Sequence, residues 1–139
     1  MAQQIHLEVV TPVGQLVSED VDIVTAPGAD GEFGVLAHHA NYLTTVKTGV
    51  LSFKTDKQVK YIMISKGFAE VSDNAVTLLV ESAEYGYDID VDRAMEAKER
   101  AEKRLLQEQA HGDELDRIRA EAALHRAVAR LAAAQRSNI

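Results

Sequence analysis

The sequence has no cysteine and no tryptophan, and only two of its 139 residues are proline. Without cysteine there can be no disulfide framework, no thiolate zinc site and no cysteine nucleophile. Aromatic residues make up only 5% of the chain against a hydrophobic fraction of 46%, so we expect a core of valine, isoleucine, leucine and alanine. No apolar run approaches the roughly 18 residues that a membrane-spanning helix needs, and the N-terminus lacks a signal-peptide pattern. These absences predict a soluble, cytoplasmic protein.

Cationic residues are few overall and unevenly placed. The formal net charge is -7, which argues against nucleic acid as a general partner. Ten of the fifteen lysines and arginines nevertheless lie between Arg93 and Arg136, so the C-terminal part of the chain is locally rich in cations. The length suits one compact domain, or one small domain with an appendage.

The character of the sequence changes between Ser82 and Ala94. Before this stretch, apolar residues alternate with polar ones and glycines separate short runs, which is typical of an antiparallel sandwich or barrel. We therefore predict an all-β sandwich domain over residues 1–87 and an antiparallel hairpin of two α-helices over residues 88–139. Val21 and Ile23 are expected on one face of their strand. The expected strands are 5–10, 16–17, 21–25, 32–36, 42–47, 50–54, 59–65, 67–71 and 76–81.

The region after residue 88 has the apolar spacing of two helices. Asp88 or Asp90 can cap the first helix by accepting a hydrogen bond from an unpaired backbone N–H group. This helix should stop near Gly112, and Asp113 is the expected N-cap of the second. The expected apolar stripes are narrow and rich in alanine, so burying them stabilises the hairpin weakly and predicts a mobile element. They contain Val91, Ala94, Met95, Ala101, Leu105 and Leu106 in the first helix, and Leu115, Ile118, Ala122, Leu124, Val128 and Leu131 in the second.

No pattern of catalytic residues is present. The chain has no nucleophile–base pattern, no paired catalytic carboxylates and no phosphate-cradling glycine loop, so we expect no enzymatic activity of its own. The pair His38-His39, together with His6, invites a metal site. Adjacent residues on a strand point to opposite faces and chelate one ion poorly, so loop or surface histidines are the preferred interpretation.

The arginines of the two helices follow helical spacing. Arg93 and Arg100 are seven residues apart and share a face of the first helix, and Arg119, Arg126 and Arg130 share a face of the second. One interpretation is a solvated charged face. The other is a guanidinium cluster that binds polyphosphate or an acidic partner surface, because arginine offers a bidentate fork to such oxygens.

Four groups of residues have a recognisable order and spacing: Ile5–Pro12; Gly31–Leu36 with His39 and Leu43; Gly67–Val71 with Asn74–Thr77; and Asp90–Arg104. Together they resemble the epsilon subunit of bacterial F-type rotary ATP synthases over essentially the whole chain. The resemblance implies a ten-stranded sandwich and a helical hairpin in a non-catalytic central-stalk (rotor) subunit. Such a subunit binds the gamma subunit and the ring of c subunits, on the cytoplasmic side of the bacterial inner membrane, and helps couple proton flow to rotation. Its hairpin folds against the sandwich or extends into the alpha/beta catalytic head, where it restrains ATP hydrolysis.

The resemblance also implies a regulatory ATP site, with no obligatory cofactor. Some members of the family bind ATP on the folded hairpin through the motif Ile/Leu-Asp-x-x-Arg-Ala, which Ile89-Asp90-Val91-Asp92-Arg93-Ala94 matches in full. By the same resemblance, Glu84 and Asp90 contact the adenine or the ribose, and the arginines contact the phosphates. The candidate ATP-binding residues are Glu84, Ile89, Asp90, Arg93, Ala94, Arg100, Arg119, Arg126 and Arg130.

One loop departs from the family pattern. Where the family usually has Pro-Gly-His-x-Pro, this chain has Ala37-His38-His39-Ala40-Asn41, which loses the rigid turn but keeps His39 in register. The candidate partner-contact residues here are Glu32, Phe33, Gly34, His38 and His39. A stand-alone ATP-binding sensor and a non-regulatory adaptor module remain the alternative functions.

Overall fold

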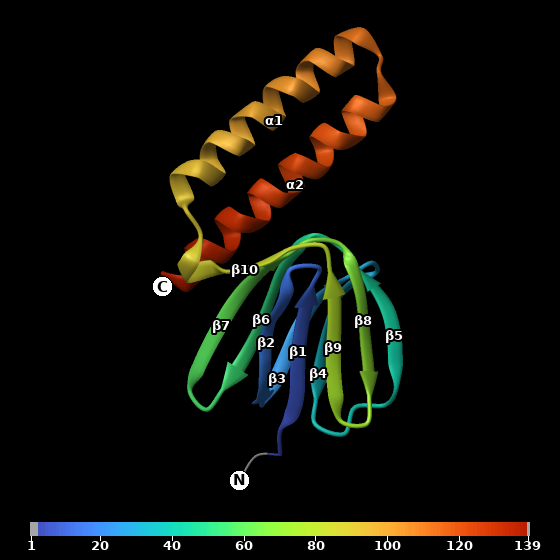
Figure 1. Ribbon diagram of the computed structural model, residues 1–139, viewed down its shortest axis with the longest axis vertical. Helices are drawn as coiled ribbons and strands as arrows, with labels where there is room; N and C mark the ends of the chain where they lie inside the picture. Colours follow the sequence, from blue (N-terminus) through green and yellow to red (C-terminus); the bar gives the residue numbers. More distant parts are fainter. Residues whose placement is uncertain (1–2, 139) are drawn as a thin grey trace.

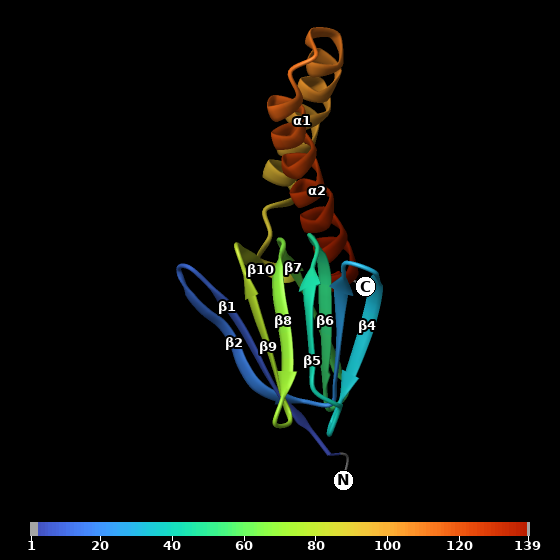
Figure 2. The same cartoon turned by 90° about the vertical axis from the view of Figure 1, so that its right-hand side faces the viewer.

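The computed structural model describes residues 3–138, apart from the side chains of residues 109–111, and shows a β-sandwich with a helical hairpin projecting from one end (Figures 1 and 2). The predicted fold class is therefore confirmed, while residues 1, 2 and 139 of the predicted ranges lie outside the described residues. The strands are β1 (Ile5–Thr11), β2 (Gly14–Val21), β3 (Ile23–Gly28), β4 (Gly31–Leu36), β5 (Tyr42–Val46), β6 (Gly49–Thr55), β7 (Gln58–Ile64), β8 (Gly67–Ser72), β9 (Ala75–Val80) and β10 (Ala83–Tyr85). A 3₁₀ helix, η1 (Gly86–Asp88), leads into α1 (Val91–His111) and α2 (Glu114–Ser137).

The ten strands form one continuous sheet that folds over on itself. Its order is β10-β7-β6-β3-β5-β8-β9-β1-β2, and β4 pairs with β3 beside this path. Every pair of described strands is antiparallel except β1 with β9, which run parallel from the His6–Ala75 pair to the Val10–Leu79 pair. The sequence predicts an antiparallel sandwich or barrel but no pairing order, and this parallel pairing of the first strand with the ninth leaves no trace in local alternation.

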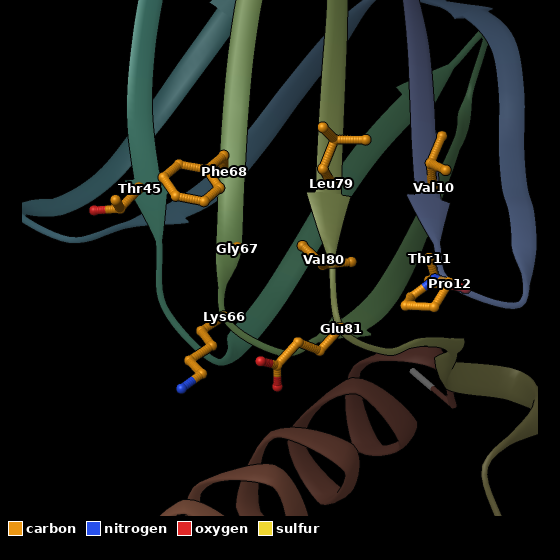
Figure 3. Close-up of a pocket in the computed structure, with 10 residues that line it drawn as sticks. All are labelled: Val10, Thr11, Pro12, Thr45, Lys66, Gly67, Phe68, Leu79, Val80 and Glu81. Carbon is orange, nitrogen blue, oxygen red and sulfur yellow. The ribbon is translucent and has the colours of Figure 1, made fainter.

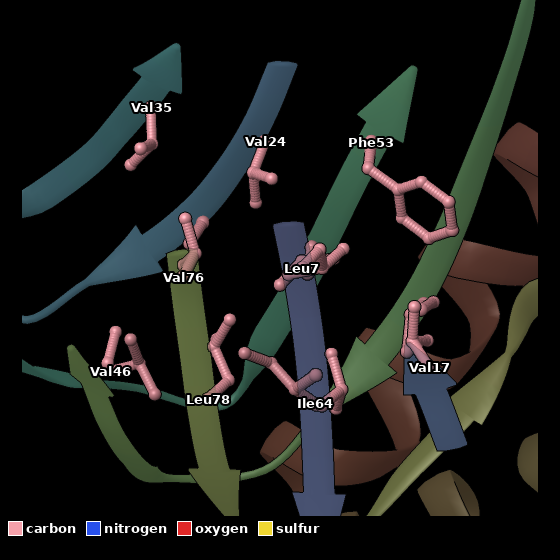
Figure 4. Packing of buried hydrophobic residues seen from close by; sticks show 14 of the residues in the cluster. Leu7, Val17, Val24, Val35, Val46, Phe53, Ile64, Val76 and Leu78 are labelled. Atoms are coloured by element: carbon pink, nitrogen blue, oxygen red, sulfur yellow. The ribbon is translucent and has the colours of Figure 1, made fainter. Parts of the chain in front are cut away.

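The core follows the alternation of apolar residues along the strands. Ile5, Leu7 and Val9 are fully buried, while the residues between them are half-buried on the outer face of β1. Figure 4 shows how side chains from opposite parts of the folded sheet meet, with Leu7 and Leu78 near Val24 and Val46. Phe53 is the only aromatic side chain among the fully buried described residues, as the low aromatic content predicts.

Two expectations for the strands are wrong. Val21 ends β2, and the chain turns at Asp22, whose backbone N–H donates to the carbonyl of Lys54 at 2.8 Å. Val21 is therefore buried, whereas Ile23 is only half-buried and Val24 takes the next core position. Strand β10 was missed by the alternation pattern, although the family resemblance implied ten strands. Its three residues are all half-buried, so they carry no alternation.

The hairpin rests on the sandwich through α2. The C-terminal half of α2 packs against β6, β7 and η1, while α1 packs mainly along α2. Met63 of β7 is fully buried under this contact, facing away from the neighbouring sandwich residues Ile62 and Ile64. No helix in the described part of the chain has both the length and the hydropathy to cross a membrane.

The predicted apolar stripes of the hairpin are only partly right: Ala94 and Ala101 are buried, but six of the twelve predicted residues, Val91 among them, are exposed. Met95 is 44% exposed and Leu106 is 68% exposed, and Leu115, Ile118 and Val128 are exposed as well. The buried positions are alanines, because the two helices and the sheet approach closely enough that only small side chains fit between them. These alanines are Ala94, Ala101, Ala120, Ala127, Ala129, Ala133 and Ala134.

Candidate functional site

The joint between sandwich and hairpin begins with β10, which pairs antiparallel with β7 and places Glu84 opposite Met63. Tyr85 stacks on Tyr87 with ring centroids 4.9 Å apart. Burial raises the pKa of Tyr85 to about 12, so its phenol stays neutral at physiological pH. The joint is thus a short paired strand followed by a single 3₁₀ turn, which holds Glu84 against the hairpin.

Asp90, one of the two candidate caps with Asp88, begins the first helix. It is the N-cap of α1, and its carboxylate accepts a hydrogen bond of 3.1 Å from the backbone N–H of Arg93. Asp113 caps α2 in the same way, and Gly112 between the helices has a left-handed backbone with φ of 71°. One carboxylate oxygen of Asp90 is therefore engaged in the helix, while the motif residues next to it face a cleft.

An ion pair ties the second helix of the hairpin to the joint. Nε of Arg130 on α2 donates to Oε1 of Glu84 on β10 at 2.7 Å. Both side chains are partly buried, at 28% and 40% exposed, so the pair is less screened by water than an ordinary surface salt bridge. Two of the candidate ATP-binding residues, 46 positions apart in sequence, are in direct contact.

Seven of the nine candidate ATP-binding residues line one cleft of about 490 Å³, which we call the first cleft. It lies between the joint, α1 and α2, and three carboxylates share it with three arginines. Its size falls within the range of small-molecule sites. The lining residues are Glu84, Asp88, Ile89, Asp90, Arg93, Ala94, Ala97, Arg100 and Arg130.

A second cleft of about 580 Å³ continues along the hairpin between α1 and α2, and it contains the two remaining candidates, Arg119 and Arg126. It shares Ala97, Arg100 and Arg130 with the first cleft. In contrast to the first cleft, its lining residues include six cations and no carboxylate. They are Ala97, Arg100, Ala101, Lys103, Arg104, Gln107, Arg119, Ala120, Ala123, Arg126 and Arg130.

Sequence reasoning missed Asp88, Lys103, Arg104 and Gln107 as lining residues. The helical spacing that joined Arg93 to Arg100 continues to Arg104 and Gln107, four and seven residues farther on, so the signal was present. Geometry and charge together give the two clefts a defined chemistry. The first offers carboxylate acceptors for amino and hydroxyl groups, and both offer guanidinium groups for phosphate oxygens.

The candidate partner-contact residues do not form one loop. Glu32, Phe33 and Gly34 belong to strand β4, and Phe33 packs edge-on against Tyr42 with ring centroids 5.5 Å apart. His38 and His39 lie in the following turn, at the end of the sandwich away from the hairpin (Figure 2). His38 has a left-handed φ of 63°, and its backbone N–H donates to Oδ1 of Asn74 at 2.8 Å. This hydrogen bond holds the turn without the family's prolines.

The outer face of the sheet carries an exposed apolar surface near the hairpin (Figure 3). Val10, Leu79 and Phe68 lie side by side on β1, β9 and β8, where Val10 pairs with Leu79 and Leu79 with Phe68. Leu79 is 54% exposed and Phe68 57% exposed, and a hollow of about 680 Å³ lies over them, edged by Lys66 and Glu81. We call this surface the apolar sheet face. Exposed apolar surface of this kind marks sites of protein association.

A Ser–His–Asp arrangement lies on the outer face of β1 and β2. His6 Nδ1 is 2.9 Å from Asp20 Oδ1, and its Nε2 is 3.2 Å from Ser18 Oγ. Glu8 Oε1 also lies 3.4 Å from the same Nε2. The hydrogen bond to Asp20 and the nearby Glu8 raise the pKa of His6, and the contacts of His6 with Asp20 and Ser18 lie on an exposed face of the sheet. The arrangement is a surface charge cluster.

One group of acidic residues has carboxylates close enough together to act as ligands of a metal ion. Carboxylate oxygens of Glu108, Asp113 and Asp116 lie within 4.8 Å of one another at the turn of the hairpin. Asp113 already accepts a hydrogen bond from the backbone N–H of Asp116 as the N-cap of α2. We interpret this group as helix-capping chemistry.

Two family models match the chain. One, described as "ATP synthase, Delta/Epsilon chain, beta-sandwich domain", matches residues 4–86, and the other, "ATP synthase, Delta/Epsilon chain, long alpha-helix domain", matches residues 88–135. The ATP synthase epsilon chain of Nitratidesulfovibrio vulgaris (strain DP4) is 52% identical over 107 residues, which cover 77% of this chain and 80% of that one. The epsilon chain of Desulfitobacterium hafniense (strain Y51) is 46% identical over 109 residues, or 78% and 83% of the two chains. Among solved structures, a chain of the Euglena gracilis mitochondrial ATP synthase (OSCP/F1/c-ring, rotational state 1) matches with a TM-score of 0.76 and 30% identity, over 88% of this chain and 76% of that chain.

Proposed function

The chain belongs to the family of ATP synthase delta/epsilon chains, and from that premise we propose that it regulates its enzyme through an ATP-controlled hairpin. By homology it is a non-catalytic epsilon subunit of the central stalk of an F-type ATP synthase. In this proposal the sandwich binds the gamma subunit and the c ring on the cytoplasmic side of the bacterial membrane. The hairpin, when extended, reaches the alpha/beta head and restrains ATP hydrolysis.

The observation that carries the proposal is the convergence of the candidate ATP-binding residues. All nine line the first or the second cleft, although they come from β10, the joint and both helices. Residues 46 positions apart meet in the Glu84–Arg130 ion pair. A charged ligand in these clefts would touch the sandwich side, α1 and α2 at once, and would favour the compact hairpin by its differential affinity for that state.

The chemistry of the clefts suits ATP in one orientation. The carboxylates of Glu84, Asp88 and Asp90 can accept hydrogen bonds from an adenine amino group or from ribose hydroxyls. Arg100 and Arg130, which belong to both clefts, then meet the start of the phosphate chain. Arg126 lies beyond them and can bind the phosphates bidentately. Residues of the joint would hold the nucleoside and the arginines the triphosphate.

Calorimetry of the isolated chain with ATP tests this site. Replacing Arg126 by alanine should weaken ATP binding by about tenfold or more, because a charge-assisted hydrogen bond is lost. Arg117 provides a matched control, since this arginine of α2 lies outside both clefts and pairs with Glu114 and Glu121. Absence of binding heat from the wild-type chain at millimolar ATP would refute the ATP site.

Truncation of the chain after Tyr87 tests the regulatory role. In the assembled ATP synthase, the truncated subunit should leave ATP hydrolysis faster than the full-length subunit does, because the inhibitory element is gone. Unchanged hydrolysis would instead favour a non-regulatory adaptor. Tight ATP binding by a chain that fails to assemble with the other subunits would favour a stand-alone sensor.

The apolar sheet face is the proposed docking site for the gamma subunit. It is exposed on the isolated chain, and the turn with His38 and His39 occupies the other end of the sandwich, where we propose contact with the c ring. Replacing Phe68 by glutamate should abolish co-purification with gamma, because the new carboxylate would be buried without a partner between the apolar sheet face and gamma. The control is Val59→Glu, a change of another exposed apolar residue outside this face. Equal retention of gamma by both variants would refute the assignment.

A further inference from the structure

The second cleft is lined by two matched rows of cations. On α1, Ala97, Arg100, Arg104 and Gln107 follow at intervals of three, four and three, so they form one stripe along the helix. On the antiparallel helix α2, a second stripe faces it, with residues at intervals of four, three and four. This stripe consists of Arg119, Ala123, Arg126 and Arg130. Alanines in both stripes leave room between the helices while arginines line the edges.

The cations of this cleft are poorly compensated by the protein itself. Arg119 reaches Asp116 only at 3.7 Å in an exposed pair, and Arg130 is held by Glu84 at the boundary with the first cleft. Like charges three and four residues apart on a helix, such as Arg100 with Arg104, repel one another. In the described part of the chain, four cations of the cleft form no ion pair with a carboxylate: Arg100, Lys103, Arg104 and Arg126.

The cationic row is longer and more highly charged than a triphosphate requires. ATP carries about four negative charges, two on its terminal phosphate and one on each inner phosphate. The second cleft alone contains six cations and no carboxylate. From Arg100, where the proposed phosphate chain begins, the stripe continues for seven residues to Gln107, about 10 Å at 1.5 Å per residue. With the nucleoside at Glu84 and Asp90, Lys103 and Arg104 lie beyond Arg100 in the second cleft and form no ion pair with a described carboxylate.

We propose that the second cleft accepts linear phosphate chains longer than three phosphates, with Lys103 and Arg104 binding the phosphates beyond the third. The proposal rests on the orientation of the nucleotide proposed above and adds a ligand class to the same site. The shared chemistry is the phosphate chain, which can be part of a nucleoside tetraphosphate or of inorganic polyphosphate. Bridging α1 to α2 along its length, such a ligand stabilises the closed hairpin more strongly than ATP does.

The test compares ligands of increasing length on the full-length chain. Dissociation constants are measured by calorimetry at fixed ionic strength without divalent cations for ATP, adenosine tetraphosphate, inorganic tripolyphosphate and inorganic tetraphosphate. Adenosine tetraphosphate should bind about five- to tenfold more tightly than ATP. The double variant Lys103→Gln/Arg104→Gln should reduce this ratio to below about twofold. Lys98→Gln, which removes a cation of the same helix outside both clefts, should leave the ratio unchanged.

Each outcome separates this proposal from the ATP site itself. Equal affinities for ATP and adenosine tetraphosphate, or an equal loss for both ligands in the double variant, would overturn the proposal while the ATP site stands. Binding of inorganic tetraphosphate without binding of ATP would overturn the ATP site and support the second cleft as a site for linear phosphate chains. If the fourth phosphate increases the affinity by a similar factor in the inorganic and the adenosine series, the phosphate chain alone is the recognised group. A gain only in the adenosine series would show that the nucleoside positions the chain.

Discussion

Gly86 controls how closely the hairpin approaches the sandwich. It lies in η1 and is buried against the last turns of α2. A Cβ atom at this position would overlap Oγ of Ser137 and the carbonyl oxygen of Ala133, and would lie 2.8 Å from the carbonyl carbon of Ala133. Its backbone does not adopt a left-handed φ, so the conflict is one of space alone. Gly86→Ala should therefore push the C-terminal half of α2 away from the joint.

The size of the effect follows from the atoms that must move. The Ser137 hydroxyl can rotate away, but the Ala133 carbonyl belongs to the backbone of α2 and moves only with the helix. Overpacking of this kind costs about 1–3 kcal/mol. The docked contact is built mostly from alanines around Met63, so it has little apolar area with which to offset that loss. The ratio of docked to undocked hairpin should fall by about 5- to 150-fold.

Hydrogen exchange measures this change directly. Backbone amides of residues 127–134 should exchange faster in Gly86→Ala, while those of β1 and β7 keep their protection. Because the chain has no cysteine, single cysteines at the exposed positions Val59 and Leu115 can also carry a fluorophore pair that reports the separation of sandwich and hairpin.

Two variants make the Gly86 prediction specific. Gly34→Ala is a matched control, since a Cβ there meets no atom closer than 3.9 Å. Adding Ser137→Ala to Gly86→Ala should restore docking only in part, because the carbonyl conflict remains. Wild-type protection of α2 in Gly86→Ala would refute the steric reasoning.

Three further predictions concern single positions. Ile62→Ala should lower the free energy of unfolding of the sandwich by about 2–5 kcal/mol in urea denaturation, whereas Met63→Ala on the opposite face should chiefly increase hydrogen exchange in α2. The pKa of His6 is raised above 6.5 by its hydrogen bond to Asp20, so its stabilising effect is fully present below pH 6.5 and is lost as the pH rises through the raised value. The stability difference between wild type and His6→Gln should therefore shrink from pH 6 to pH 8 in denaturation curves, and a difference independent of pH would contradict this. Gly112→Ala should lower helical stability in thermal circular dichroism by about 1 kcal/mol, because a φ of 71° strains any residue with a Cβ, and an unchanged melting curve would argue against that strain.

Most of the strands are predictable from the sequence because they bury one face. Alternation along β1 is sufficient to assign Ile5, Leu7 and Val9 to the core, where all three are fully buried. The pattern fails where burial does not alternate, as in β10, whose three residues are equally half-buried. The alternation does not show which residues face the core where one strand ends and the next begins, as at Val21, Ile23 and Val24. The pairing of β1 with β9 is a long-range contact and has no local signature.

The hairpin shows why apolar stripes mislead when helices approach closely. The predicted stripes were rich in alanine, yet they left out Ala127, Ala133 and Ala134, which fill the contact, and included Leu115 and Ile118, which are exposed. Asp113 was predicted as a cap and Asp90 as one of two candidate caps beside Asp88, because capping depends on a local hydrogen bond. The convergence of the arginines required the antiparallel pairing of the helices, which spacing within one helix cannot supply.

Docking of the hairpin and binding in the first cleft are thermodynamically linked. Glu84 belongs to the last strand of the sandwich and Arg130 to α2, so the cleft exists in full only while α2 is docked. For a ligand that contacts both the sandwich and α2, the apparent dissociation constant equals the intrinsic dissociation constant divided by the fraction of molecules with α2 docked. By reciprocity, that ligand stabilises docking by the same factor. If Gly86→Ala leaves one tenth of the molecules docked, ATP affinity must fall about tenfold, and saturating ATP must restore the protection of α2. Loss of docking at unchanged ATP affinity would mean that the nucleotide binds the helices alone and cannot act as the lock.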